Sequence, residues 1–570
     1  MKPRRCDART PLLGLVHALL FALAFPDVHA EAGLWPLAFF AVVPLAWLAL
    51  LAPSARWAAV SVFITQLVMW LWIGRWLVQV TVPGYVPYAL ILSVYPTIFV
   101  LLLRWVSRHP RLGSVPLALS VPVLWVGIEF LRGEIAFDGY PWYLVGHPLV
   151  EAPILAQSAD LFGAYFISFL AAMTAGATVA VLHDGVGRAW RSAALVAGVL
   201  AVNAGYGAWR LSQPDMLSDG PTMLIVQTNL PQNNKMRSSP QEQLEHFDSF
   251  IELTVNGLLA ARDQGERVEV MVWPETMLPG FGFEPESVAF LVRENLFPLD
   301  HFTRNIELLV ERSGVPMLVG SAAAVGLRYE EDDDHARLLD SDARYNAAYL
   351  IQNGVPKQRY DKVFLTPFGE TMPYISRWPW LEQKMLSFGA SGMKFNLDRG
   401  GSMHPLVVAA NELRGEVSLA TPICFEATMA WVCRGLVYDR GEKRASALVN
   451  LTNDAWFGWF APGRVQHAQV SRFRAIENRV PMVRAANSGV SMAIDSMGRI
   501  TDAIGSGRYG EPMRADVLTV TPRFDARIAP YAIIRDVWGW LCFSLTLLIA
   551  CWAVATWRSA RVLRRAQTES

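Results

Sequence analysis

Long apolar segments and one long stretch of mixed polarity divide the chain. A membrane span needs roughly 20 apolar residues at 1.5 Å rise per residue. Seven runs of about that length lie before residue 212, and one more lies near the C-terminus. We place the eight predicted spans near residues 11–26, 34–52, 57–80, 84–104, 115–132, 159–182, 192–211 and 534–557.

The stretch between the seventh and eighth runs is too long for a loop and has the size of a folded domain. We therefore predict seven transmembrane helices in residues 1–212 and one extramembrane domain in residues 220–525. The eighth helix is predicted over 533–558, and a basic tail over 559–570.

Short β-branched runs alternate with amphipathic segments inside this domain, which indicates a layered α/β fold. The acidic run Tyr329–His335 is predicted to be a solvated loop. Helices are predicted over 240–263 and 465–479, and strands over 222–228, 268–273, 316–323, 344–352, 406–409, 415–423, 446–451, 482–495 and 499–501.

Composition agrees with a membrane protein, because 53% of the residues are hydrophobic and the mean hydropathy is +0.27. The 50 basic and 50 acidic residues balance, so nothing favours nucleic-acid binding or an acidic disordered chain. The cysteines form no CxxC pair or cluster with histidines, and we expect no metal and no cofactor. As an alternative, Cys424 and Cys433 could form a disulfide, which would leave Cys424 without a free thiol to act as a nucleophile.

The positions of the cations predict an orientation, because short cytoplasmic loops retain Lys and Arg. Every second connection is basic, and the alternate connections carry almost no Lys or Arg. Both termini are therefore predicted to be cytoplasmic and the large domain periplasmic. The basic connections contain Lys2 to Arg9, Arg104 to Arg111, Arg188 and Arg191, and Arg558 to Arg565. As an alternative, residues 2–30 resemble a cleavable signal peptide ending in Val28–Ala30.

Three predicted strand ends each present one reactive side chain: Glu275, Lys362 and Cys424. Loops at strand ends are where layered α/β folds collect catalytic groups. A thiol needs a base to become a nucleophile, and a tetrahedral oxyanion needs a cation or N–H donors. Glu275 would be the base, while Lys362 and the backbone N–H after Cys424 would bind the oxyanion.

Four sequence blocks resemble the nitrilase (carbon–nitrogen hydrolase) superfamily and its Glu-Lys-Cys triad. With seven spans before them and one after, the whole chain resembles the apolipoprotein N-acyltransferase family. The blocks are VWPE at 272–275, YDKVFLTPFGE at 360–370, TPICFE at 421–426 and NLTNDAWFG at 450–458. The resemblance implies a nitrilase-like α-β-β-α domain inserted in an eight-helix transmembrane domain.

The resemblance also implies site residues. Glu275, Lys362 and Cys424 match the catalytic triad, and Glu370 matches a second essential acid that orients Lys362 or the incoming amine. Glu426 matches a further acid near the thiol. Two positions depart from the family pattern: Phe425 stands where a Tyr is expected, and Met236 stands where a Trp is expected in a substrate-covering loop.

Aromatic residues near these blocks have two interpretations. The cluster Trp456–Phe460, with Trp378 and Trp380, is either core and interface packing or the wall of an acyl-chain groove. The segment Phe137–Trp142 is either an interfacial anchor or a lipid-facing rim. His467 is expected to be structural.

The implied reaction moves a fatty acyl chain from a phospholipid to the α-amine of a diacylglyceryl-cysteine apolipoprotein through a thioester on Cys424. We expect a membrane-embedded monomer of the bacterial inner membrane, with a mobile lid that excludes water. One rival function is a membrane-tethered amidase that uses the same triad. Another is a transporter or receptor with an inactive outer domain, for which Glu129 and Asp160 are the main intramembrane ionisable candidates.

Overall fold

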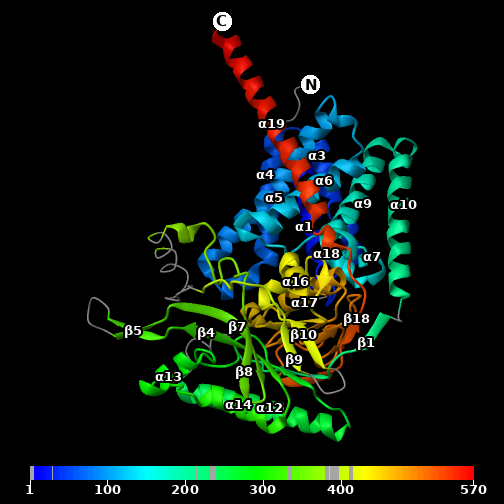
Figure 1. Cartoon of the computed structure of the whole chain (residues 1–570). Coiled ribbons are helices and arrows are strands. Elements are labelled where there is room, and N and C mark those ends of the chain that lie inside the picture. Colours follow the sequence, from blue (N-terminus) through cyan, green and yellow to red (C-terminus); the bar gives the residue numbers. More distant parts are fainter. Residues whose placement is uncertain are drawn as a thin grey trace. The chain divides into compact units, whose positions relative to one another are not determined.

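The computed structural model describes most of the chain, and its internal contacts divide it into two units. The helix unit comprises residues 1–212 with 534–570, and the sheet unit comprises residues 213–533. Figure 1 shows the elements of both. The described residues are 6–27, 30–213, 216–230, 239–331, 337–378, 380, 384, 397–409 and 415–569.

Apolar helices make up the helix unit. Two of them begin at capping side chains, because Ser54 accepts a hydrogen bond from Trp57 N (3.1 Å) and Thr81 accepts one from Gly84 N (3.1 Å). The helices are α1 Arg9–Ala24, α2 Ala38–Ala41, α3 Val43–Leu51, α4 Ala55–Ile73, α5 Val82–Arg108, α6 Leu117–Phe130, α7 Pro153–Ala156, α8 Ala159–Phe162, α9 Ala164–Asp184, α10 Val186–Leu211 and α19 Val537–Glu569.

Five helices among the described residues are long and apolar enough to cross a membrane. They are Ala55–Ile73, Val82–Arg108, Ala164–Asp184, Val186–Leu211 and Val537–Trp557. The other three predicted spans fall on shorter elements: α1, the segment Trp35–Leu51, and α6 with the π-helical turn Leu131–Ile135 that follows it. The count of eight spans therefore stays a prediction. Val28 and His29, in the possible cleavage site, lie outside the described residues.

The ionisable residues that a transporter would need are held by neighbours within the helix unit. Asp160 accepts hydrogen bonds from Arg210 Nε (2.7 Å) and Tyr206 Oη (2.8 Å). Glu129 accepts from Trp125 Nε1 (2.9 Å) and from Val145 N (2.7 Å). These contacts fasten helices and connecting segments to one another, which is the usual use of buried polar pairs inside a bundle.

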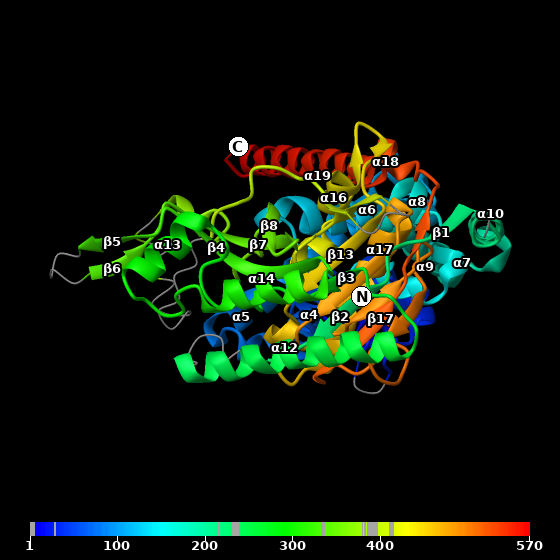
Figure 2. The ribbon, with the colours of Figure 1, turned by 60° about the horizontal axis from the view of Figure 1, so that its bottom comes forward.

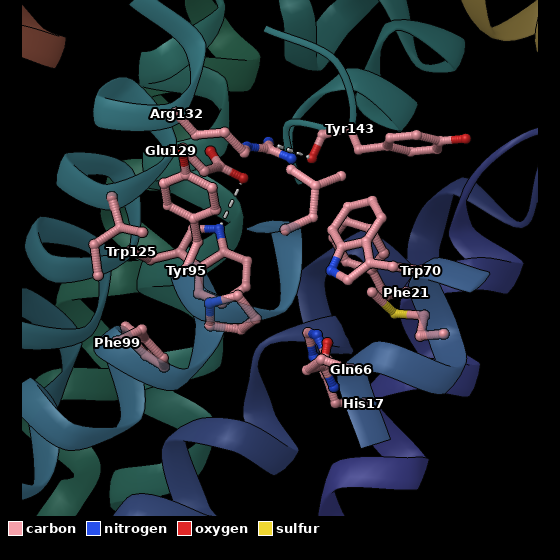
Figure 3. A pocket seen from close by; sticks show the side chains of 14 residues that line it. His17, Phe21, Gln66, Trp70, Tyr95, Phe99, Trp125, Glu129, Arg132 and Tyr143 are labelled. Atoms are coloured by element: carbon pink, nitrogen blue, oxygen red, sulfur yellow. Dashed lines mark hydrogen bonds between the residues drawn. The ribbon is translucent and has the colours of Figure 1, made fainter. Parts of the chain in front are cut away.

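Figure 3 shows a cavity within the helix unit, with Glu129 and Arg132 near one end and His17 and Gln66 near the other. Its volume is about 30 Å³, which is room for one or two water molecules. The wall is mostly apolar, and includes the aromatic side chains of Trp70 and Trp125. Trp142, from the segment with two interpretations, is also buried in this unit.

Two mixed six-stranded sheets form the centre of the sheet unit. The first has the order β17-β2-β3-β4-β7-β8, with β2, β3 and β4 parallel. Its strands are β2 Met223–Gln227, β3 Val270–Val272, β4 Met317–Val325, β7 Ala343–Gln352, β8 Val355–Asp361 and β17 Asp516–Val520.

The second sheet has the order β16-β15-β14-β13-β10-β9, with β10, β13 and β14 parallel. Its strands are β9 Leu406–Ala409, β10 Glu416–Ala420, β13 Ala447–Thr452, β14 Met482–Ala486, β15 Met492–Ile494 and β16 Ile500–Ala503.

Helices cover the two sheets (Figures 1 and 2). On the first sheet lie α12 Pro240–Asp263, α13 Pro285–Arg293 and α14 His301–Ser313, and on the second lie α16 Ala430–Val437 and α17 Ala461–Asn478. Helix α12 starts in a capping box in which Ser239 and Glu242 bond each other's backbone N–H. Phe247 and Phe250 of α12 pack with Trp273 and Phe302 in the core beneath the helices.

The sheets are linked to each other by side chains. Asn487, just after β14, donates from Nδ2 to Leu230 O (2.7 Å) and accepts at Oδ1 from Leu230 N (2.6 Å) and Thr228 Oγ1 (2.8 Å). Thr228 and Leu230 directly follow β2 of the first sheet. These bonds fix the ends of the parallel strands of one sheet against those of the other.

Most predicted elements of this unit are present, and α12 has the predicted bounds. The prediction of a loop over Tyr329–His335 is wrong at its start, because Arg328–Glu331 forms strand β5 and pairs with β6, Arg337–Asp340. Alternating side chains and cross-strand pairing outweighed the charge of this segment. Sequence patterns also missed α13, α14, α16 and β17, and they placed a strand end at Lys362 without giving bounds for the strand, β8. The strand predicted over 482–495 is two strands, β14 and β15. The remaining strands are β1 Leu217–Asp219 with β18 Arg523–Asp525, and β11 Tyr438–Asp439 with β12 Glu442–Lys443; the short helix α18 spans Tyr531–Ile534.

Candidate active site

Cys424 follows β10 and begins a 3₁₀ turn, Cys424–Thr428. Its backbone φ is +50°, in the left-handed region that a non-glycine residue rarely adopts. Cys424 is a free thiol and is partly exposed, while Cys433 is free and buried. The disulfide between them, left open from the sequence, does not form. A strained, accessible cysteine at a strand end has the placement that a nucleophile needs.

Glu275 lies past the end of β3 with both carboxylate oxygens occupied. Oε1 accepts from Asn346 Nδ2 at 2.7 Å, and Oε2 accepts from Asn453 N at 2.8 Å. The chain can reach this position because Gly320 of β4 has no side chain: a Cβ there would lie 2.6 Å from Glu275 Cα. Glu275 is thus held from strands of both sheets.

Lys362 follows β8 and is 1% exposed at its side chain. Its Nζ lies 2.7 Å from Glu370 Oε2 and 3.7 Å from Glu275 Oε1. Glu370 also accepts from Thr366 N (2.8 Å) and from Asn346 Nδ2 (3.0 Å). One buried ammonium thus lies between two carboxylates, with Asn346 bonded to both.

These charges set the protonation of the site. Burial lowers the pKa of Lys362, but Glu370 and Glu275 outweigh burial and hold that pKa above its ordinary value. Burial raises the pKa of Glu370, but Lys362 outweighs it and the pKa is lowered. Burial and the nearby Glu275 carboxylate raise the pKa of Cys424, and Lys362 opposes them. The resting residue is therefore a thiol, and it needs a base to become a thiolate.

Glu426 joins the lysine segment to the cysteine segment. Its carboxylate accepts from Ile423 N (2.8 Å), Val363 N (2.8 Å), Phe364 N (3.0 Å) and Tyr360 Oη (3.0 Å). Ile423 precedes Cys424, and Val363 follows Lys362. Burial raises the pKa of Glu426 to about 7 against these donors. With these partners, Glu426 fixes the backbone on both sides of the site.

A buried network centred on Arg484 of β14 holds the backbone of Cys424. Arg484 donates to Asn450 Oδ1 (2.7 Å) and to Asp454 Oδ2 (2.6 Å). Asn450 Nδ2 donates to Pro422 O (2.8 Å) and contacts Cys424 O (3.5 Å). His467 bonds Asp454 Oδ1 through Nδ1 (2.8 Å) and also hydrogen-bonds the Cys424 backbone. The strained turn is therefore supported from β13, β14 and α17.

The electrostatics of this network favour an ionised Asp454 and a neutral His467. Burial raises the pKa of Asp454, but Arg484 and His467 outweigh it and hold the pKa well below its ordinary value. Burial and Arg484 lower the pKa of His467. The expectation that His467 is structural agrees with these contacts.

The structure places the other predicted residues as follows. Phe425 is buried, and its ring stacks on Phe364 at 6.1 Å between centroids. Trp456 is half-buried in the turn Asp454–Phe457, while Trp378 is 52% exposed and Trp380 is 66% exposed, so these two are not core residues. Met236 lies outside the described residues.

Sequence reasoning missed Asn346, Asn453 and Arg484 as site residues. Asn346 lies in the strand sequence RYNAAYL at 344–350, next to apolar residues. A polar residue within a buried strand is the signal that would have singled it out. Arg484 stands likewise within buried β14, where an arginine needs a partner.

Comparison with known proteins identifies the family of the chain. The sequence model for the apolipoprotein N-acyltransferase N-terminal domain matches residues 17–177, and that for carbon–nitrogen hydrolases matches residues 225–512, about half of the chain. The chain belongs to the apolipoprotein N-acyltransferase family.

Individual relatives of this family match over most of the chain. The apolipoprotein N-acyltransferase of Geobacter metallireducens is 29% identical over 96% of this chain and 95% of the relative. That of Bradyrhizobium diazoefficiens is 30% identical over 83% of this chain and 79% of the relative. A solved amidase of the nitrilase superfamily from Nesterenkonia matches with a TM-score of 0.35 and 16% identity, over 56% of this chain and 95% of that chain. The chain is thus a membrane acyltransferase with a carbon–nitrogen hydrolase domain.

Proposed function

We propose that this enzyme transfers a fatty acyl chain from a phospholipid to the N-terminal α-amine of a diacylglyceryl-cysteine apolipoprotein. The observation that carries the proposal is the meeting of Glu275, Lys362 and Cys424 from three separate strand ends. The match to the family over both units supports it. Both substrates carry lipid tails, which fits a catalytic domain attached to apolar helices.

In the first step, Glu275 takes the proton of Cys424, and the thiolate attacks the carbonyl carbon of a phospholipid ester. Lys362 and the Phe425 N–H stabilise the resulting oxyanion. The C–S bond forms, the ester C–O bond breaks, and the lysophospholipid oxygen takes the proton back from Glu275. The product is an acyl thioester on Cys424.

In the second step, the α-amine of the acceptor attacks the thioester carbonyl. The C–N bond forms and the C–S bond breaks, while Glu275 takes the amine proton and returns one to the departing Cys424 sulfur. Glu370 keeps Lys362 in place through both steps. Water must be excluded from the thioester between them, and a lid over the site is part of the proposal.

The proposed location is the bacterial inner membrane, with the sheet unit in the periplasm and both termini in the cytoplasm. The eight predicted spans and the basic residues at every second connection support this topology. The proposed division of the chain is helices in residues 1–212 and 533–558, a catalytic domain in 220–525 and a basic tail in 559–570. We propose a monomer that needs neither metal nor cofactor.

The experiment that tests the proposal uses the full chain in detergent micelles with phosphatidylethanolamine labelled in its acyl chain. The parent chain should gain one acyl mass that hydroxylamine removes, and Cys424→Ala should gain none. Adding a diacylglyceryl-cysteine peptide should move the label to the peptide amine. Turnover of small amides without a labelled protein would support the amidase instead. Normal lipoprotein acylation in cells that carry only Cys424→Ala would refute the proposal.

A further inference from the structure

Asn346 of β7 contacts both carboxylates of the site. Its Nδ2 lies 2.7 Å from Glu275 Oε1 and 3.0 Å from Glu370 Oε1. We propose that Asn346 is a positioning residue that keeps these two carboxylates in separate roles, Glu275 as the base and Glu370 as the partner of Lys362. This inference rests on the proposed function and deepens it.

The amide orientation follows from the charges around it. An Asn NH₂ group has two protons, one for each of two carboxylate oxygens, whereas a flipped side chain would place its carbonyl oxygen against two anions. Asn346 is 5% exposed, and its Oδ1 has no hydrogen-bond partner among the described residues. An unpartnered buried acceptor is costly, and the two charge-assisted bonds on the other side offset that cost.

The backbone fixes Asn346 to Lys362 as well. Lys362 N donates to Asn346 O at 2.9 Å, so both side chains start from one rigid edge of the sheet. Lys362 Nζ contacts Glu370 at 2.7 Å and Thr366 Oγ1 at 3.5 Å, while Glu275 Oε1 stays at 3.7 Å, beyond a hydrogen bond. Because Asn346 occupies Glu275 Oε1, the base is not drawn fully onto the ammonium, and Lys362 keeps a proton for the oxyanion.

Two titratable groups act directly on Glu275: the Lys362 ammonium after β8 and the Cys424 thiol after β10. Glu370 is linked to Glu275 through the Asn346 amide and Lys362, which both carboxylates share. Removing the Asn346 amide takes a close neutral donor from Glu275 Oε1 and leaves the Asn453 N–H on Oε2. A carboxylate that loses a donor is protonated more easily. The rate of thioester formation should then need a higher pH.

The test measures acylation of Cys424 against pH in the full chain by intact-protein mass spectrometry. Two acyl donors are used: phosphatidylethanolamine, and p-nitrophenyl butyrate as a small activated ester. For Asn346→Ala, the acid limb of the rate profile should move up by about one pH unit, and the rate should partly recover at high pH. Asn346→Asp places a third carboxylate in the site and should be slower than Asn346→Ala at pH 7.

Thr254→Val is the matched control. Thr254 is buried, and its Oγ1 accepts the Trp273 Nε1–H at 2.9 Å and donates to Phe250 O at 2.7 Å. Thr254→Val therefore loses two buried hydrogen bonds in the same domain, the same number as Asn346→Ala. In Thr254→Val, the rate of Cys424 acylation should depend on pH as it does in the parent. An unshifted profile in Asn346→Ala, or parental rates in Asn346→Asp, would overturn the inference. A shift seen with the small ester, with no acylation by phospholipid even in the parent, would sustain the role of Asn346 and refute the proposed function. No acylation of the parent by either donor would overturn both.

Discussion

Asp454→Asn tests whether the Arg484 network holds the Cys424 turn for catalysis, in addition to stabilising the fold. The substitution keeps the size of the side chain and removes its charge. Arg484 would then face a neutral group 2.6 Å away, in a place where both side chains are at most 1% exposed. Breaking a buried ion pair by removing one partner costs about 3–5 kcal/mol. We expect a value near the lower end, about 3 kcal/mol, because an Asn oxygen can still accept from Arg484.

Adding Arg484→Met to Asp454→Asn should recover part of this free energy, because the uncompensated buried charge is removed. The rate of Cys424 acylation should not recover, because Asn450 and His467 both lose partners in the network. Asp454→Asn alone should slow acylation of the folded enzyme by about 100-fold, the usual cost of displacing a reacting group by roughly an ångström.

Pulse proteolysis of the full chain across a urea series measures the unfolding of the sheet unit, and mass spectrometry measures acylation. Asp525→Asn is the matched control: Asp525 is buried, and its Oδ1 accepts from Arg527 Nε at 2.7 Å. Both variants should lose stability, and only Asp454→Asn should lose rate. The reasoning fails if Asp454→Asn lies within about 1 kcal/mol of the parent, or if both variants slow acylation equally.

Two further predictions concern protonation. Folding keeps the pKa of Glu426 near 7 instead of its ordinary 4.5, so the parent should lose about 3 kcal/mol of unfolding free energy relative to Glu426→Gln as pH rises from 4.5 to 8. Urea unfolding of both chains at three pH values checks this, and a constant difference would contradict it. Lys362 opposes the raised pKa of Cys424, so Lys362→Met should slow iodoacetamide alkylation of Cys424 at pH 9 by about tenfold, while Lys362→Arg should retain most of the rate. Equal alkylation in Lys362→Met and the parent would count against the electrostatic role of Lys362.

The sequence predicts much of the fold because local patterns carry it. The apolar runs locate the helices of the helix unit, and the capping box before α12 marks where that helix begins. Strands β2, β4, β7, β13 and β14 are near-continuous apolar runs, as expected for buried strands. The bounds of β8 were not predicted because charged residues interrupt that strand. Strand β17 carries one charge, at its first residue Asp516, and its pairing with β2 decides its conformation.

The site is predictable only in part, for a similar reason. Glu275, Lys362 and Cys424 stand at the ends of recognisable strands, and their motifs resemble a family. The bonds of Asn346 and Arg484 join residues up to 71 positions apart in sequence, and such pairings follow from the packing of the two sheets. The role of Glu426 as a link between backbone segments is likewise invisible before Val363 and Ile423 are placed beside it.

Because the site is assembled from two sheets, this enzyme can lose activity before it unfolds. Glu275 and Lys362 extend from the first sheet and Cys424 from the second, and among the described residues no strand ladder joins them. The two sheets are instead linked by side-chain bonds of Glu426, Asn487 and Glu275 and by a backbone bond from Asn229 N to Asn487 O. A small displacement of one sheet against the other would separate Cys424 from Glu275 while every strand stayed paired within its own sheet. On heating, the enzyme should therefore lose its acylation activity at a lower temperature than that at which the sheets unfold.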